Sequence, residues 1–188
     1  MTDSLKEVVL ETLRYEFGLK KDSIKEYIDE STGIKYISGV DKNGVASFIS
    51  LDLFEYVERT GAQTEVTFDA DQKVLENENS MALIKELMHA LLSREYDVEQ
   101  TPGEFHRFEN KEYIKQFNKV GYALFLGNCG DPYYIDDDIG EEYTGFFMFK
   151  LVFFNEDEMQ ELERIDNEDD RLDYIINHYD ENNGSRLV

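Results

Sequence analysis

The chain of 188 residues carries 42 acidic and 19 basic side chains, a formal net charge of −23, and 41% of its residues are apolar. This apolar content excludes disorder caused by low hydrophobicity, and no uncharged apolar run approaches the ~20 residues that span a bilayer. The N-terminus lacks the basic residue of a signal peptide and Cys129 is the single cysteine, so we expect a soluble cytoplasmic protein of a bacterial or phage-infected cell.

The first fifty residues are expected to form two helices and a β-hairpin. Ser4-Leu5-Lys6-Glu7 has the spacing of a capping box, and apolar residues at helical spacing after it predict a helix that ends near Gly18. A second box at Ser23-Ile24-Lys25-Glu26 predicts a short helix. Ile34–Val40 and Val45–Leu51 are rich in β-formers, and the Asn-Gly pair between them favours a tight turn, which predicts a hairpin.

The next segment is expected to contain the central helix of the core. Leu51–Arg59 predicts a short helix and Thr64–Phe68 a strand, and the polar segment Asp69–Ser80 is expected to be a loop. Met81–Leu92 carries a broad apolar stripe at helical spacing, which predicts a core helix.

Thr101-Pro102-Gly103 is a predicted turn and the expected boundary between an N-terminal α+β half, residues 1–100, and an acidic α+β half, residues 101–188. A single domain of residues 1–188 is the alternative. After the turn, the pattern predicts a strand at Glu104–Phe108, a helix carrying Tyr113 and Phe117, and a buried strand at Tyr122–Leu126.

The last third is expected to contain two strands and then two helices. Tyr133–Ile135 and Gly145–Phe154 read as strands on either side of an acidic loop, Asp136–Glu142. Asn155, with Glu158 at the capping-box position, begins one helix, and Asp166 or Asn167 begins another. Without regular alternation of strands and helices, the elements predict an α+β fold with a mainly antiparallel sheet, helices on one face and an acidic helical C-terminus.

The side chains that usually carry catalysis do not form a recognisable set. His89, His106 and His178 lack the spacing of helical zinc ligands, and we expect each to be a packed or surface histidine. Asp131 near Cys129 would raise the pKa of the thiol, which disfavours a nucleophile there. We therefore predict no catalytic residues, no metal and no cofactor.

The acidic residues are concentrated towards the C-terminus and are interleaved with aromatic residues. Residues 129–188 contain 18 acidic and 4 basic side chains, a net charge of −14, against −9 for residues 1–128. Such a surface repels nucleic acid and anionic membranes and attracts basic proteins, and ordered carboxylates can imitate the phosphates of a duplex. The predicted contact residues are Tyr133, Asp136, Asp137, Asp138, Glu141, Glu142, Tyr143, Asp169, Asp170 and Asp173.

Phe125-Leu126-Gly127-Asn128-Cys129-Gly130-Asp131-Pro132-Tyr133-Tyr134-Ile135-Asp136 resembles the strand–turn–strand motif of the SUKH superfamily. That superfamily contains many bacterial immunity proteins that neutralise nuclease-type toxins. The resemblance covers about a dozen residues, and the chain lacks the leucine–proline helix and the tryptophan that the family places before and after the motif. It implies an acidic module that binds a basic enzyme.

Composition and resemblance lead to one functional hypothesis and two alternatives. We expect a non-catalytic inhibitor that blocks the nucleic-acid-binding surface of a nuclease or related protein, in toxin immunity or in phage anti-restriction or anti-CRISPR defence, with a DNA mimic as one form. The first alternative is a metal-dependent hydrolase that uses the carboxylates of residues 131–142, since carboxylate oxygens suit Ca²⁺ and Mg²⁺. The second is an acidic adaptor or scaffold.

Overall fold

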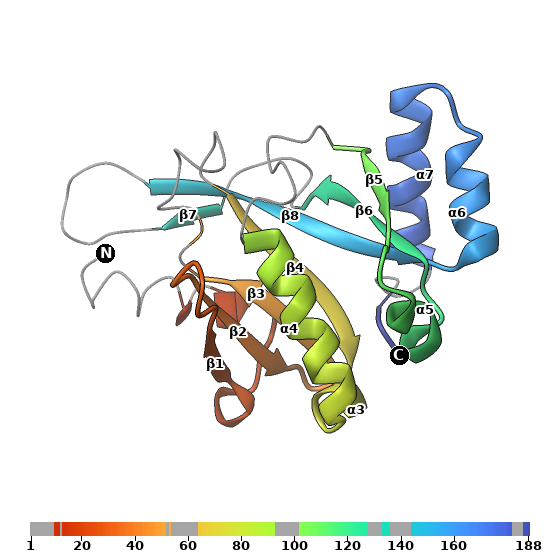
Figure 1. The fold of residues 1–188 in the computed structure, drawn as a ribbon. Coiled ribbons are helices and arrows are strands. Elements are labelled where there is room, and N and C mark those ends of the chain that lie inside the picture. The colour runs from red at the N-terminus through yellow and green to blue at the C-terminus, as the bar shows by residue number, and fades with distance from the viewer. Residues whose placement is uncertain are drawn as a thin grey trace.

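The computed structural model describes residues 10–11, 13–51, 53, 64–92, 102–127, 133–135, 144–181 and 186–188, with the backbone alone at 133–135, 144, 145 and 181. Within these ranges, eight strands form one sheet in the order β1-β2-β3-β4-β8-β6-β5, and β7 pairs with β8 off this path (Figure 1). The strands are β1 (Lys25–Ile28), β2 (Lys35–Val40), β3 (Val45–Ser50), β4 (Thr64–Asp71), β5 (Phe105–Arg107), β6 (Gly121–Leu126), β7 (Tyr133–Ile135) and β8 (Thr144–Phe154).

The helices lie mainly in the middle and at the end of the chain. Figure 1 shows α4 crossing in front of the sheet and α6 and α7 side by side at its right-hand end. The described helices are the 3₁₀-helix η1 (Lys21–Ser23) and the α-helices α3 (Gln72–Leu75), α4 (Glu78–Leu92), α5 (Lys111–Phe117), α6 (Glu156–Glu163) and α7 (Glu168–Glu181). The chain is helical as well over the described residues between 10 and 16. No helix in these ranges combines the length and the apolar character needed to cross a membrane.

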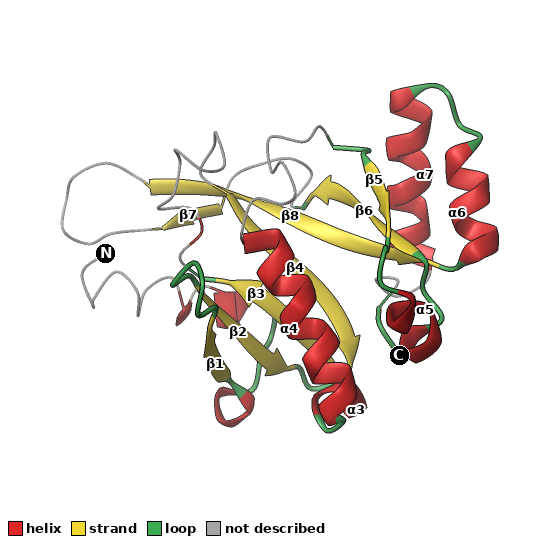
Figure 2. Cartoon of the chain, in the orientation of Figure 1, coloured by secondary structure: helices red, strands yellow, loops and turns green. Residues whose placement is uncertain are grey.

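Strands from both parts of the chain share the sheet. Neighbouring strands are antiparallel except β4 and β8, which pair in parallel from Thr64 opposite Phe147 to Thr67 opposite Lys150. In Figure 2 the long strand β8 runs from β7 to the base of α6. The α+β class with a mainly antiparallel sheet is therefore confirmed.

Helices cover both faces of the sheet rather than one face as predicted. Along β8, Phe149, Leu151 and Phe153 belong to the apolar cluster beneath α4 and α5. Val152 and Phe154 alternate with them and pack instead against α6 and α7. Because side chains alternate across a strand and β8 is apolar on both sides, each face needs its own helical cover.

The face opposite α4 carries two apolar clusters with polar side chains between them. The cluster that contains Leu13 and Leu19 covers β2, β3 and the start of β8, and the cluster beneath α6 and α7 covers β6 and the end of β8. Ser47 of β3, Asp69 of β4 and Lys150 of β8 lie between the clusters and line a pocket on this face. This polar strip separates the N-terminal helical cover from α7.

The C-terminal segment continues the sheet where β4 and β8 part. Leu187 forms a parallel bridge with Ala70, its amide donates to the Asp69 carbonyl at 3.1 Å, and its carbonyl accepts from the Asp71 amide at 2.8 Å. The side chain of Leu187 is 0% exposed and belongs to the cluster beneath α4. The segment thus pairs with the end of β4, beyond the residues that pair with β8.

Two local predictions are wrong. Ser23–Glu26 forms the end of η1 and the start of β1 instead of a helix, because the Ser23 hydroxyl accepts from the Val40 amide at 2.8 Å and β1 pairs with β2. The polar segment from residue 69 to residue 80 is not a loop. Its first residues extend β4 because they pair with Val45–Ser47 of β3, and α3 and α4 follow.

The other described elements agree with the predictions. The hairpin of β2 and β3 turns through Gly44, whose φ is 81°, and the core helix is α4. Asn155 and Glu158 form the predicted capping box of α6, and the side chain of Asn167 accepts from the Asp170 amide at the start of α7. The capping box at residues 4–7 lies outside the described residues, as does the helix predicted over Leu51–Arg59 apart from residues 51 and 53.

Candidate binding surface and a second pocket

The predicted contact residues fall into two groups. Asp169, Asp170 and Asp173 lie on α7, and all three side chains are exposed. Tyr133 begins β7, where the backbone alone is described. The others lie outside the described residues: Asp136, Asp137, Asp138, Glu141, Glu142 and Tyr143.

The solvent-facing side of α7 carries a row of carboxylates. Asp169, Asp173 and Asp180 are separated by four and then seven residues, so they follow one side of the helix, and each is exposed. We call these three residues the α7 stripe. Ile175, which is fully buried against β6 and β8, holds the opposite side of the helix to the sheet. Asp180 is not among the predicted contact residues, although a regular helix from Asn167 would place it on this side.

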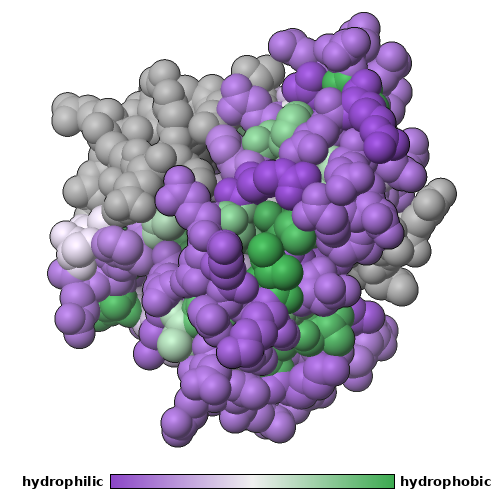
Figure 3. Space-filling model, turned by 45° about the vertical axis from the view of Figure 1, so that its right-hand side comes forward, coloured by the Kyte–Doolittle hydropathy of each residue, from purple (hydrophilic) through white to green (hydrophobic). Residues whose placement is uncertain are grey.

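No residue of the α7 stripe makes an ion pair within the described ranges. The one arginine of α7, Arg171, packs its guanidinium 5.3 Å from the centre of the Phe105 ring and donates to the Ile165 carbonyl. Figure 3 shows a mainly hydrophilic face, with hydrophobic side chains gathered near the centre of the view. The stripe therefore presents charge that the described residues leave uncompensated.

The carboxylates of α6 are used inside the molecule instead. Arg107 of β5 donates to Glu163 at 2.6 Å and to Glu156 at 3.0 Å, which ties α6 to the edge of the sheet. These hydrogen bonds lower the pKa of both carboxyl groups and raise the pKa of the guanidinium. One guanidinium thus offsets part of the charge of the two glutamates.

Two further carboxylates of α6 also have partners within the fold. Glu161 accepts from the Tyr174 hydroxyl at 3.1 Å, and burial together with this carboxylate raises the pKa of Tyr174 to about 12. Glu158 completes the helix cap and lies 3.9 Å from the ammonium of Lys119. Four of the five carboxylates of α6 thus have a partner in the fold, Asp157 being the exception, whereas no carboxylate of the α7 stripe has one among the described residues.

A polar trough of about 400 Å³ adjoins the C-terminal end of α7. Ser47, Asp69 and Lys150 lie among its lining residues, together with Tyr179 and Asp180 of α7. Lys150 donates to the Tyr179 hydroxyl at 3.2 Å, and the Ser47 hydroxyl donates to Asp69 at 2.7 Å. Burial raises the pKa of Asp69 although Ser47 and Lys150 oppose the shift. The trough extends the acidic surface of α7 onto the sheet.

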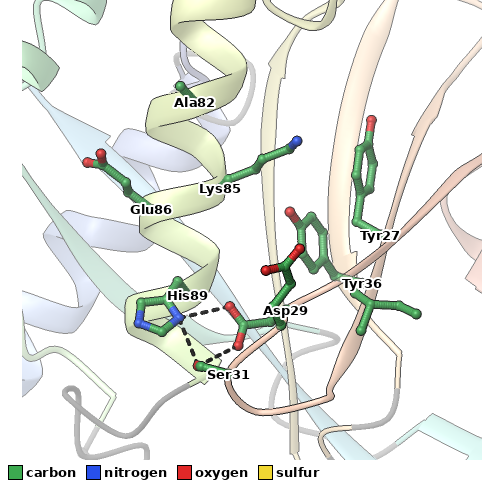
Figure 4. A pocket seen from close by; sticks show the side chains of 10 residues that line it. Tyr27, Asp29, Ser31, Tyr36, Ala82, Lys85, Glu86 and His89 are labelled. Carbon is green, nitrogen blue, oxygen red and sulfur yellow. Dashed lines mark hydrogen bonds and ion pairs between the residues drawn. The ribbon is translucent and has the colours of Figure 1, made fainter.

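A second pocket lies on the α4 face, between α4 and the edge formed by β1 and β2 (Figure 4). At one end, Nδ1 of His89 lies 2.8 Å from a carboxylate oxygen of Asp29, which joins α4 to the β1–β2 turn. The other oxygen of Asp29 accepts from the Ser31 hydroxyl and from the amide and hydroxyl of Thr32, each at 2.8 Å. Burial would raise the pKa of Asp29, but these bonds hold it well below its usual value.

The Ser31–His89–Asp29 group does not have the geometry of a nucleophilic triad. A triad needs the serine on one ring nitrogen and the carboxylate on the other. Here the Ser31 oxygen lies 3.2 Å from Nδ1 of His89, the same nitrogen that faces Asp29, and the Ser31 hydroxyl donates to Asp29. The group therefore braces the turn against α4 and does not activate Ser31.

The other two histidines are packed within the fold, as predicted. His178 is buried with its ring stacked on Phe154, 4.6 Å between centres. His106 lies half-buried beside Tyr122, and burial lowers its pKa. Among the described residues, no group of three or more His, Cys, Asp or Glu side chains is arranged to hold a metal ion.

The pairing of His89 with Asp29 could not be found from the sequence. The two residues lie 60 positions apart, and neither belongs to a motif with a fixed spacing. The α7 stripe, by contrast, follows from the acidic composition and the helical period. Comparison of the chain with protein-family models and with curated proteins gives no match.

Proposed function

We propose that this protein is a non-catalytic acidic inhibitor, which binds a basic nucleic-acid-acting protein and blocks its nucleic-acid-binding surface. Toxin immunity and phage anti-defence are the two settings that this activity suits. The observation that carries the proposal is the unpaired state of the α7 stripe among the described residues, beside an α6 in which four of the five carboxylates have partners. A row of carboxylates without partners stabilises the fold little and is suited to a cationic surface.

The charge of the surrounding segment supports this proposal. Residues 155–181 contain 12 acidic and 2 basic side chains, a net charge of −10 in 27 residues. Arg171, one of the two basic residues, is engaged with Phe105 and Ile165. The field of such a segment reaches about 8–10 Å at cellular salt, which is enough to steer a basic partner towards α7.

The spacing of the stripe also supports imitation of a nucleic-acid strand. A rise of about 1.5 Å per residue places Asp173 ~6 Å and Asp180 ~16.5 Å along the axis from Asp169. Phosphates of one DNA strand repeat about every 3.4 Å along the helix axis, so two and five nucleotides span ~7 and ~17 Å. A basic groove that follows a phosphate backbone would therefore meet carboxylates near the same intervals.

Affinity capture at two salt concentrations tests the proposal. The immobilised chain is exposed to bacterial lysate from which nucleic acid has been digested, and proteins eluted by salt are identified by mass spectrometry. We expect a basic nuclease or other nucleic-acid-binding protein whose association rate falls steeply with salt. The triple variant Asp169→Asn, Asp173→Asn and Asp180→Asn should slow association with this protein by about tenfold or more.

A matched variant separates the stripe from overall charge. Glu26→Gln, Glu76→Gln and Glu109→Gln remove the same charge from exposed positions on other elements, and this variant should associate nearly as fast as the wild type. Equal slowing by both triple variants would show that net charge alone steers the partner. Capture of no basic protein, or binding that salt does not weaken, would contradict the proposal.

A further inference from the structure

The pocket between α4 and the β1–β2 edge has the dimensions of a small-molecule site. Its volume of about 480 Å³ lies within the range of known ligand pockets. Figure 4 shows the side chain of Lys85 directed from α4 across the pocket towards Tyr27 and Tyr36, with His89 and Asp29 at one end. Glu86 points to the other side of α4, where it accepts from the Asn110 amide at 3.1 Å.

The polar groups that remain available in this pocket are mainly donors. The Asp29 carboxylate already accepts four hydrogen bonds, from Ser31, Thr32 and His89. The ammonium of Lys85 and the hydroxyl of Tyr36 have neither a hydrogen-bond nor an ion-pair partner among the residues that the structure describes. The remaining lining carboxylate, Glu30, is exposed at the rim. A ligand with acceptor oxygens would satisfy both free donors.

The wall opposite α4 is aromatic. The rings of Tyr27 and Tyr36 stack with 5.0 Å between centres and 13° between planes, and Lys85 Nζ lies 5.9 Å from the centre of the Tyr27 ring. The Tyr36 side chain is 3% exposed, and burial, Tyr27 and Asp29 together raise its pKa to about 12. Tyr36 therefore keeps its proton at neutral pH and serves as a donor. A flat apolar body fits beside this wall.

We propose that this pocket binds a small organic acid, whose carboxylate or phosphate oxygens contact Lys85 Nζ and the Tyr36 hydroxyl and whose planar body packs beside Tyr27. Lys85 supplies the charge, and Tyr36 fixes the direction of the second hydrogen bond. The Asp29–His89 pair closes the end of the pocket and holds the β1–β2 turn in place. The site shares no residue with the α7 stripe and does not depend on the function proposed for that stripe.

Nuclear magnetic resonance titration of the full chain tests the site with three probes. Benzoate and phenyl phosphate each carry one of the two candidate anionic groups on a phenyl ring, and benzamide is the uncharged counterpart of benzoate. The Cε1–H signal of His89 reports binding. His106 on β5, at the opposite end of the sheet from β1, and His178 on α7, stacked on Phe154, serve as internal references. We expect one or both anions to shift the His89 signal saturably with a Kd in the low millimolar range or below, about 1–10 mM at the weakest.

Two variants assign the contacts. Lys85→Gln should weaken binding of the anionic probe by about tenfold or more, and Tyr36→Phe by several-fold, because each removes one donor. Lys111→Gln, on the exposed start of α5, removes the same charge elsewhere and should leave binding unchanged. The stronger of the two anions identifies the phosphate or the carboxylate as the preferred group.

Three results would overturn the proposal. The first is the absence of a saturable His89 shift with either anion. The second is binding of benzamide as tight as that of benzoate, which would show that the ring alone is recognised. The third is wild-type affinity in Lys85→Gln, with native chemical shifts elsewhere showing that the variant is folded.

Discussion

Substitution of Asp29 by Asn tests the brace between the β1–β2 turn and α4. The Asp29 side chain is 9% exposed and accepts four hydrogen bonds. Asn keeps an oxygen for Ser31 and Thr32 but removes the charge that strengthens these bonds, and it turns an amide group towards His89. Hydrogen bonds to charged groups contribute about 1.5–3 kcal/mol and neutral ones about 0.5–1.5, so we expect Asp29→Asn to lower the free energy of unfolding by about 2–3 kcal/mol at pH 7.

The difference in the free energy of unfolding between the wild type and Asp29→Asn should depend on pH. The folded-state pKa of Asp29 lies below its usual value of about 4, so the charged form stabilises the fold above that pH. This stabilisation is lost as the pH falls towards the folded-state pKa, and Asn at the same position does not titrate. The difference between wild type and Asp29→Asn should therefore shrink between pH 6 and pH 3, because the other carboxyl groups titrate in both proteins.

Urea unfolding of both proteins at several pH values measures this difference, with an unchanged m-value as the check that the same transition is followed. Asp22→Asn, an exposed position in η1, is the control and should change the free energy of unfolding by less than about 0.5 kcal/mol. A loss at pH 7 no larger than that of the control would refute the brace. So would a difference that stays constant with pH.

Three other substitutions test the packing around the sheet. Leu187→Ala should lower the free energy of unfolding by about 2–5 kcal/mol in urea, whereas Val188→Ala, at a side chain 53% exposed, should change it by less than about 0.5. Gly121→Ala places a Cβ against the backbone carbonyl of His106 in β5, so we expect the free energy of unfolding to fall by about 1–3 kcal/mol. Amide exchange should accelerate, relative to the wild type, more in β5 than in β4. Arg107→Gln should raise the pKa of Glu156 towards its usual value of about 4.3, followed through the carboxyl carbon signal, and an unchanged pKa would show that the two groups do not interact in solution.

The elements that were predicted correctly have signals within a few residues. Asn43-Gly44 determines the tight turn between β2 and β3, where Gly44 has a positive φ. The capping box of α6 forms both of its bonds, from the Asn155 amide to Glu158 at 2.7 Å and from the Glu158 amide to Asn155 at 3.1 Å. In each case the interaction is complete inside one segment, so distant parts of the chain do not decide it.

The wrong predictions concern segments whose partners are far away in the sequence. The hydroxyl of Ser23, expected to cap a helix, accepts a hydrogen bond from the Val40 amide 17 residues later, and β2 pairs with β1. A single turn of helix is marginal alone, so the backbone bonds of the sheet prevail. In the second segment, Asp69 faces the trough and Asp71 lies 3.6 Å from the ammonium of Lys73, so composition alone does not show that these polar residues pair with β3.

The candidate sites divide in the same way. The α7 stripe could be anticipated in part, since Asp169 and Asp173 follow the helical period after the Asn167 cap. The pairing of Glu156 and Glu163 could not, because Arg107 reaches both from a strand some fifty residues earlier. Separation of paired from unpaired carboxylates therefore needs the tertiary structure, although their number is plain in the sequence.

Displacement of DNA from the captured partner tests the proposed inhibition most directly. A fluorescently labelled duplex is bound to that protein, and its anisotropy is followed as the acidic chain is added. Inhibition at the nucleic-acid-binding surface predicts full release of the duplex near one equivalent, with the Asp169→Asn, Asp173→Asn and Asp180→Asn variant requiring about tenfold more protein. Formation of a stable complex in which the partner keeps the duplex and its cleavage activity would contradict the proposed function.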